Sequence, residues 1–264
     1  MMDFLETTRG IQIAYEVVGE GPLLLLVHGF ASNYHTNWVR SRVADRLMGA
    51  GYRTAMLDLR GHGHSSRPHD PQAYGPEAFF FDLRTLLDAI GTHQVGMVGY
   101  SFGARLVVGY APRDPRVAAA VLGGVGGKFL GPSSPGSEEE AAEHEATAAA
   151  MEAPDPASLA PGRPRRFRIW AEAAGADLAA LAALQRCLVS WPRFPLSDLK
   201  VPTLVISGDQ DDLAGDPQEL ASLLPNARAA VVPGNHMNAV ISPRFAEEVA
   251  RAMSSLQGGL SWET

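Results

Sequence analysis

The stretch that decides the fold reads Val95-Gly96-Met97-Val98-Gly99-Tyr100-Ser101-Phe102-Gly103. Its first four residues predict a buried strand, and the apolar run that follows Gly103 predicts a helix, so a sharp turn lies between them. A serine at such a turn is forced into a strained backbone conformation, and the flanking glycines lack the Cβ atoms that would clash there. Its hydroxyl is held beside a helix N-terminus, whose free N–H groups can receive an oxyanion. Ser101 is therefore the candidate nucleophile, the alternative being a buried serine in a glycine-rich turn.

Three more clusters of polar residues follow short apolar runs. Residues 23–27 lead into His28-Gly29-Phe30, residues 203–207 lead into the segment 208–212, and residues 229–233 lead into Gly234-Asn235-His236. Ligand-facing loops lie at this end of the strands in open α/β sheets. The four clusters are therefore expected to meet in space.

The order Ser, Asp, His along the chain resembles that of the α/β-hydrolase superfamily. The resemblance extends from about Thr8 to Met253 and is weaker over residues 128–198. It implies a mostly parallel central sheet with helices on both faces, and a small helical cap. The implied domains are a core of residues 1–127 and 199–264 and a cap insertion of residues 128–198.

The pattern of apolar residues also predicts alternating strands and helices, which specifies a mostly parallel sheet covered on both faces. Residues 11–17 alternate as an exposed antiparallel edge pair does, and 131–136 form a loop. Residues 137–153 form either a cap helix opened by a capping box at Ser137 or a flexible excursion. Residues 167–189 read as one helix, and the glycines between 123 and 127 as a hinge into the cap. The other strands are expected at 23–27, 52–57, 95–98, 117–122, 203–207 and 229–233, and the other helices at 39–49, 79–90 and 243–256.

Composition narrows the class of protein. The chain has 264 residues, 46% of them hydrophobic, and a formal net charge of −7, which argues against nucleic acid as a partner. The single cysteine allows no intramolecular disulfide. The first residues carry no signal-peptide pattern and no run is long enough to span a bilayer, so a cytoplasmic protein without membrane contact is expected. A homo-oligomer stays open. The basic run 163–168 reads as a solvated helix start.

His236 is the candidate general base, because among eight histidines it alone follows the last predicted strand and precedes the C-terminal helix. Three aspartates, Asp209, Asp211 and Asp212, compete to orient it. The Gly-x-x-Asp spacing of the superfamily, counted from Gly208, selects Asp211.

By the same resemblance, the oxyanion hole consists of the backbone N–H groups of Phe30 and Phe102. His35 and Met237 are candidate substrate contacts, and Trp170 and Trp191 are expected to close an apolar pocket over Ser101. No metal and no organic cofactor is expected. His62-Gly63-His64 has too tight a spacing for two ligands on one face, and the glycine-rich run 123–127 lacks the Lys-Ser/Thr of a phosphate loop.

The expected activity is the hydrolysis of carboxylic esters or lactones through an acyl-enzyme on Ser101. Carbon–carbon bond hydrolysis is an alternative, although the residue after His236 is Met237 and not tryptophan. Perhydrolase chemistry with peroxide is a second alternative, and a non-enzymatic ligand receptor is a third. The resembling epoxide hydrolases and haloalkane dehalogenases use an aspartate where this chain has Ser101.

Overall fold

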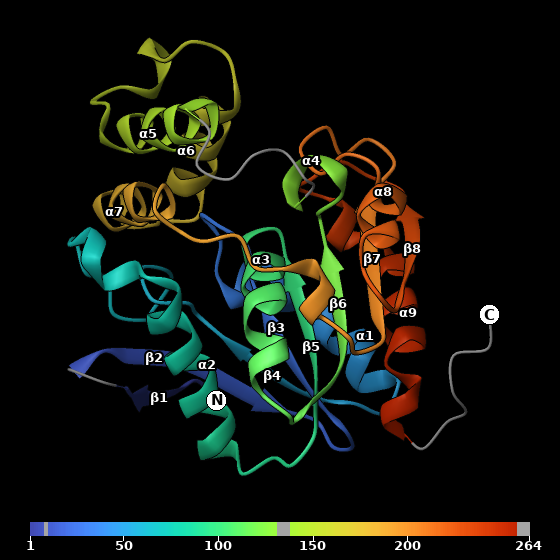
Figure 1. Cartoon of the computed structure of the whole chain (residues 1–264). Helices are drawn as coiled ribbons and strands as arrows, with labels where there is room; N and C mark the ends of the chain where they lie inside the picture. The colour runs from blue at the N-terminus through green and yellow to red at the C-terminus, as the bar shows by residue number, and fades with distance from the viewer. Residues whose placement is uncertain (8–9, 131–137, 258–264) are drawn as a thin grey trace.

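A computed structural model describes residues 1–7, 10–130 and 138–257 (Figure 1). These residues form an eight-stranded sheet in the order β1-β2-β4-β3-β5-β6-β7-β8. The β1–β2 and β2–β4 pairs are antiparallel and all other pairs are parallel, as the sequence predicts for most of the sheet. The strands are β1 (Asp3–Glu6), β2 (Gln12–Val18), β3 (Leu23–Val27), β4 (Arg53–Leu57), β5 (Val95–Tyr100), β6 (Val117–Gly123), β7 (Thr203–Gly208) and β8 (Ala227–Val232).

Helices cover both faces of the sheet because its central strands are apolar on both sides. In β3, Leu25 and Val27 face one core cluster, whereas Leu24 and Leu26 face the other. Helices α2, α3 and α8 supply residues to the first cluster, and α1 and α9 supply the second. The helices are α1 (Val43–Gly49), α2 (Pro76–Ile90), α3 (Phe102–Tyr110), α4 (Gly127–Leu130), α5 (Glu138–Glu152), α6 (Arg163–Ala173), α7 (Leu178–Leu188), α8 (Pro217–Ser222) and α9 (Pro243–Ala252).

Residues 11–17 do belong to an antiparallel pair at the edge of the sheet: β2 pairs with β1, and β1 is the outermost strand. The sequence does not predict β1 itself, because it is short and mostly exposed and has no apolar run. One predicted helix differs in the structure. The single helix expected at 167–189 is two helices. Gly175 has a φ of 63°, which ends the first, and the Asp177 carboxylate accepts a hydrogen bond from the Ala180 N–H (3.0 Å) and starts α7.

The segment between β6 and β7 contains α4 to α7, and α5, α6 and α7 lie together over one end of the sheet (Figure 1). We call α5, α6 and α7 the insertion helices. They share a small core that includes Met151, Phe167 and Leu181, and this core continues into Ala31 of the β3 loop. Residues 138–152 are therefore a packed helix. Ser137 and the loop expected at 131–136 lie outside the described residues.

The basic run 163–168 does begin a helix, but its last residue is not solvated as predicted. Arg168 is buried, and its guanidinium donates hydrogen bonds to the carbonyls of Ala150, Met151 and Ala153. These carbonyls belong to the end of α5, where backbone oxygens lack helical partners. Arg168 therefore joins α6 to the C-terminus of α5.

The glycines after β6 allow close packing. A Cβ on Gly126 would lie 2.6 Å from the Gly215 carbonyl, and one on Gly127 would lie 1.9 Å from a carboxylate oxygen of Glu219. The hinge stays a prediction, whereas the close approach of the chain is what the structure shows. In the three ranges that the structure describes, no helix has the length and apolar character needed to cross a membrane.

Candidate active site

Ser101 lies at the turn between β5 and α3 with φ 53° and ψ −110°, a conformation that residues other than glycine rarely adopt. The turn is tight on both sides. A Cβ on Gly99 would lie 2.4 Å from the Gly103 carbonyl oxygen, and a Cβ on Gly103 would lie 2.1 Å from the Val27 carbonyl oxygen. The two glycines are therefore required by sterics, and the strained turn directs the serine away from the sheet.

A chain of hydrogen bonds runs from Ser101 through His236 to Asp211. The Ser101 Oγ lies 3.0 Å from Nε2 of His236, and Nδ1 of His236 lies 3.0 Å from Oδ2 and 3.1 Å from Oδ1 of Asp211. All three residues are buried. With the proton on Nδ1 donated to the carboxylate, Nε2 is free to accept the serine proton.

The structure separates the three candidate aspartates. Asp211 alone contacts His236, and it also accepts hydrogen bonds from the N–H groups of Leu213 and Ala214. Asp209 accepts a hydrogen bond from the Gly234 N–H (2.8 Å). Asp212 lies 3.1 Å from a guanidinium nitrogen of Arg166.

Tyr100 holds the histidine loop in place, a role that the sequence does not reveal. Its hydroxyl donates a hydrogen bond to the His236 carbonyl (2.7 Å), and the two rings lie 5.7 Å apart. Burial raises the pKa of the Tyr100 hydroxyl well above its usual range, so the phenol remains a donor. The only hint in the sequence is its position next to Ser101.

The loop after β3 is fixed by a neutral histidine and an asparagine. Nδ1 of His28 donates to the Gly29 carbonyl (2.8 Å), and Nε2 accepts from the Leu59 N–H (3.0 Å). Burial lowers the pKa of His28 to about 4, so the ring is uncharged. The Asn37 side chain accepts from the Gly29 N–H (3.2 Å), a contact that the sequence does not predict.

The backbone amides of Phe30 and Phe102 remain available. In the part of the chain that the structure describes, neither N–H donates to a protein acceptor. Phe102 is the first residue of α3, where an N–H has no partner within the helix. Both amides can therefore receive an oxyanion, as the predicted oxyanion hole requires.

Two cavities meet at Ser101. The charged cavity, of about 550 Å³, extends under α5 and α7. Phe30, Phe102 and Leu188 also line it, but most of its wall is ionisable: Arg105, Lys128, Glu139, Glu140, Glu143, His144, Arg163, Arg166, Arg193 and Asp212.

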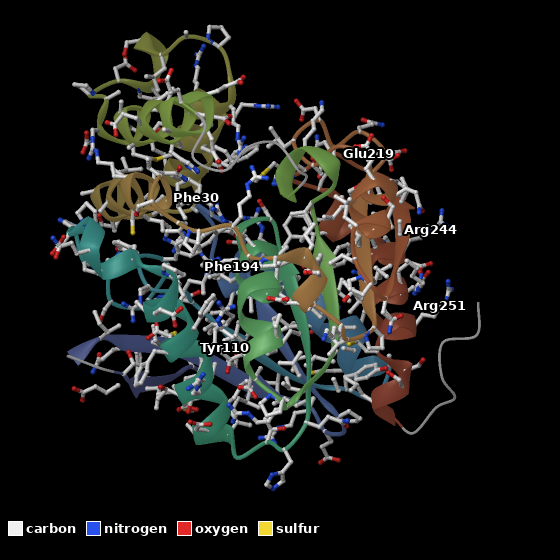
Figure 2. The ribbon with its side chains drawn as sticks, in the orientation of Figure 1. Phe30, Tyr110, Phe194, Glu219, Arg244 and Arg251 are labelled. Atoms are coloured by element: carbon white, nitrogen blue, oxygen red, sulfur yellow. The ribbon has the colours of Figure 1, made fainter. Side chains whose placement is uncertain are left out.

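The apolar cavity, of about 250 Å³, lies on the side of His236 between α6 and the loop after β8. Phe30 contributes to both walls, and its ring packs edge-on against Phe167 of α6 at 5.4 Å. Figure 2 shows Phe30 between the insertion helices and the sheet. The apolar side chains of its wall include Phe167, Trp170, Met237, Val240 and Ile241.

The four predicted substrate contacts lie in different places. Met237 and Trp170 line the apolar cavity. Trp191 does not lie on either cavity wall: it is buried behind Phe102, with its rings 5.7 Å away, and its indole N–H donates to the Tyr74 carbonyl. His35 is exposed and lines neither cavity. The expectation of a wholly apolar pocket over Ser101 is therefore wrong, because one of its two cavities is charged.

His62, whose spacing from His64 argues against a metal site, is fully buried. It packs against His28 with ring centroids 5.1 Å apart. Burial lowers its pKa to about 3, and Nδ1 donates to the Arg60 carbonyl (3.1 Å). Across residues 1–7, 10–130 and 138–257, no cluster of three or more His, Cys, Asp or Glu side chains has an arrangement suited to a metal ion.

Residues 22–147 match a family model described as alpha/beta hydrolase fold. A protein of Synechocystis named as a candidate non-heme chloroperoxidase is 29% identical over 254 residues, which cover 87% of this chain and 89% of that protein. Epoxide hydrolase B of Mycobacterium tuberculosis is 36% identical over 104 residues, only 39% of this chain and 28% of that enzyme. A thermophilic esterase from Thermogutta terrifontis superposes with a TM-score of 0.79 and 24% identity over 97% of this chain and 99% of its own.

The chain has the α/β-hydrolase fold, and just under half of it, residues 22–147, matches the family model of that fold. The proteins to which it is similar are named for three different chemistries, so the fold does not by itself select a reaction.

Proposed function

We propose that this protein is a serine hydrolase that cleaves carboxylic esters or lactones through an acyl-enzyme on Ser101, without a cofactor. One observation carries the proposal: a strained, buried serine lies 3.0 Å from a histidine that is itself held by a buried carboxylate. A serine hydroxyl is a weak nucleophile, and this is the arrangement that activates it.

The reaction proceeds in two halves. His236 takes the Ser101 proton as Oγ attacks the carbonyl carbon, and the resulting oxyanion accepts hydrogen bonds from the Phe30 and Phe102 amides. The imidazolium, stabilised by Asp211, then protonates the leaving alcohol. In the second half His236 deprotonates water, the hydroxide attacks the acyl carbon, and the imidazolium returns the proton to the Ser101 Oγ as the acyl–oxygen bond breaks and the acid leaves.

The segment 128–198 acts, in this proposal, as a cap on a core made of residues 1–127 and 199–264. The supporting contacts are those of Phe167 with Phe30 and the shared lining of both cavities by insertion helices. A cap of this kind excludes bulk water and determines which groups reach Ser101.

Perhydrolase activity is the second candidate, and the relative named for chloroperoxidase chemistry is the observation that favours it. It uses the same acyl-enzyme, since hydrogen peroxide in place of water yields a peracid and free Ser101. Incubation with acetate, peroxide and bromide, with bromination followed spectroscopically, tests it. Carbon–carbon hydrolysis and a receptor role have no such observation in this chain.

Turnover of p-nitrophenyl esters by purified protein tests the main proposal. Ser101→Ala is expected to remain folded and to lose at least about 10⁴-fold in kcat, because the three residues act as a unit. Fluorophosphonate should add once, on Ser101, as measured by intact mass and peptide mapping. Ser222→Ala, which changes an exposed serine of α8, is the matched control and should label fully. A fully active Ser101→Ala protein would contradict the proposal.

A further inference from the structure

Arg105 lies on α3, one turn after Ser101, and lines the charged cavity. We propose that Arg105 binds a carboxylate of the substrate, so that the ester carries an anionic group on one of its two parts. This inference rests on the proposed esterase function of Ser101 and adds the class of substrate.

The first supporting observation is how the charges in this cavity are matched. Arg163 lies 2.8 Å from Glu143, Arg166 lies 3.1 Å from Asp212, and Arg193 lies 3.9 Å from Glu140. For Arg105, by contrast, the described ranges contain no ion pair within 4.0 Å and no hydrogen-bond acceptor. Among the described residues, Arg105 and the exposed Lys128 are the cations of this cavity without an ion pair, and Arg105 is the one that is partly buried.

The second observation is the partial burial of Arg105. Desolvation lowers the pKa of its guanidinium from the usual value, and this is the largest effect on the group. One side of the guanidinium lies over the Trp191 ring, 5.4 Å from the ring centroid. A partly desolvated guanidinium without a protein acceptor is stabilised by an anion, and a bidentate carboxylate is the ligand that matches its planar donors.

The charged and titratable side chains near Arg105 do not provide its guanidinium with an acceptor. Glu140 raises the pKa of Arg105 through its charge, and Arg193 opposes it. These two side chains are themselves a pair. His144 is held uncharged, because burial lowers its pKa, and its Nδ1 contacts Gln185 Oε1 at 2.7 Å.

The apolar cavity on the other side of Ser101 completes the substrate class. Phe167, Trp170 and Met237 supply an apolar wall there, although the exposed Arg40 also lines this cavity, and the opposite cavity supplies Arg105. The two halves of the ester therefore differ: one is anionic and the other is apolar. A monoester of a dicarboxylic acid, or an aliphatic ester of a carboxylated alcohol, satisfies both cavities.

The test compares anionic esters with neutral esters of similar size. One arm uses monophenyl glutarate against phenyl pentanoate, and the other uses 4-carboxyphenyl pentanoate against phenyl pentanoate. The wild type is expected to show at least a tenfold higher kcat/KM for the anionic ester in one arm. In Arg105→Met, which keeps an apolar side chain over Trp191, that ratio is expected to fall by at least tenfold, and Arg105→Lys should lie between them.

Arg113→Met is the matched control. Arg113 also lies over aromatic rings, 5.2 Å from Phe80 and 5.5 Å from Phe194, but it does not line the charged cavity. The ratio of kcat/KM for anionic to neutral esters in Arg113→Met should equal that of the wild type. The inference is overturned if the wild type shows no preference in either arm, a result that does not depend on whether Arg105→Met folds. It is also overturned if the preference survives in a folded Arg105→Met.

The two proposals fail in different ways. Neutral esters hydrolysed through a labelled Ser101, with no role for Arg105, would contradict only the carboxylate site. If no ester is cleaved and Ser101 is not labelled, the proposed function fails. In that case calorimetry tests the carboxylate site directly. Glutarate is expected to bind to the wild type and not to Arg105→Met, and absence of binding to the wild type overturns the inference.

Discussion

At the scale of single residues, position along the loop decides which carboxylate contacts His236. Three aspartates occur within residues 209–212, and of these Asp211 has its carboxylate 3.0 Å from the imidazole Nδ1, whereas Asp209 accepts from the Gly234 N–H and Asp212 pairs with Arg166. The chemistry of the three side chains is identical. Their partners give them different roles.

Asp211→Asn is expected to lower kcat by about 10⁴-fold, because the amide favours the wrong imidazole tautomer. Asp209→Asn is the matched control and should stay within about tenfold, a barrier change of about 1.4 kcal/mol, since an amide oxygen still accepts from Gly234. Steady-state kinetics on one p-nitrophenyl ester measures both. A larger loss in Asp209→Asn than in Asp211→Asn would reverse the assignment.

His28 and His62 predict a loss of stability in acid. Their native pKa values, about 4 and about 3, lie below the unfolded value of about 6.5, so the unfolded chain binds protons first as the pH falls. Above pH 6.5 neither histidine lowers the free energy of unfolding. It decreases below that by up to about 1.4 kcal/mol per pH unit for each histidine, until the native pKa is reached.

His62→Asn keeps a donor for the Arg60 carbonyl and removes one of the two titrating groups. Urea unfolding at pH 7.5, 6 and 5 should therefore show a shallower loss than in the wild type, by about 1 kcal/mol per pH unit below 6. His93→Asn, at an exposed histidine, should follow the wild type. Equal slopes in His62→Asn and wild type would refute the assignment.

At the scale of elements, the turn between β5 and α3 exists because the chain can approach itself closely there. Gly103 lies against the Val27 carbonyl, so α3 packs directly on β3, and the same contact places the Ser101 turn beside the β3 loop that carries Phe30. One short contact therefore positions the helix, the neighbouring strand and the backbone amides of Phe30 and Phe102.

Gly103→Ala is expected to lower the free energy of unfolding by at least about 3 kcal/mol, because the new Cβ would lie 2.1 Å from a backbone oxygen that cannot move alone. Gly49→Ala is the matched control: it lies in α1 with nothing within 4 Å of the added Cβ, and it should be neutral or stabilising by up to about 1 kcal/mol. Chemical denaturation compares the two. Equal stabilities would contradict the steric argument.

At the scale of the whole molecule, the site forms where the insertion helices meet the sheet. Phe30, from the β3 loop, contacts Phe167 of α6, and Leu213, from the loop after β7, packs against the same insertion core. The substrate site is therefore shared between segments far apart in the chain, and the two tryptophans of the insertion contribute differently to it.

Trp170→Ala is expected to enlarge the apolar cavity and to shift the preferred ester from short to longer aliphatic chains, with little change in stability. Trp191→Ala should instead cost about 3–5 kcal/mol of unfolding free energy, because its side chain is buried and its N–H is hydrogen-bonded to Tyr74. Specificity profiles from acetyl to octanoyl esters and thermal unfolding separate the two effects. A chain-length shift confined to Trp191→Ala would contradict this placement.

Much of the catalytic arrangement can be predicted from the sequence, because it depends on local patterns. Ser101 follows from a strand, a glycine-flanked turn and a helix, each of which is readable from neighbouring residues. His236 follows from its place after the last predicted strand, and the choice of Asp211 among three aspartates follows from the Gly-x-x-Asp spacing of the superfamily that the chain resembles. Parallel strands end at one edge of the sheet, so loops that follow them meet without further information.

The tertiary structure decided the rest, because burial and pairing depend on distant residues. The sequence predicts that Trp170 and Trp191 both close an apolar pocket at Ser101, because their local sequence does not distinguish them. In the structure Trp170 lines a cavity and Trp191 lies in the core. Nothing local shows that Arg163 and Arg166 pair with carboxylates of other segments, whereas Arg105 has no ion pair among the residues that the structure describes. Charge matching in a cavity is a property of the assembled fold, and only the fold reveals it.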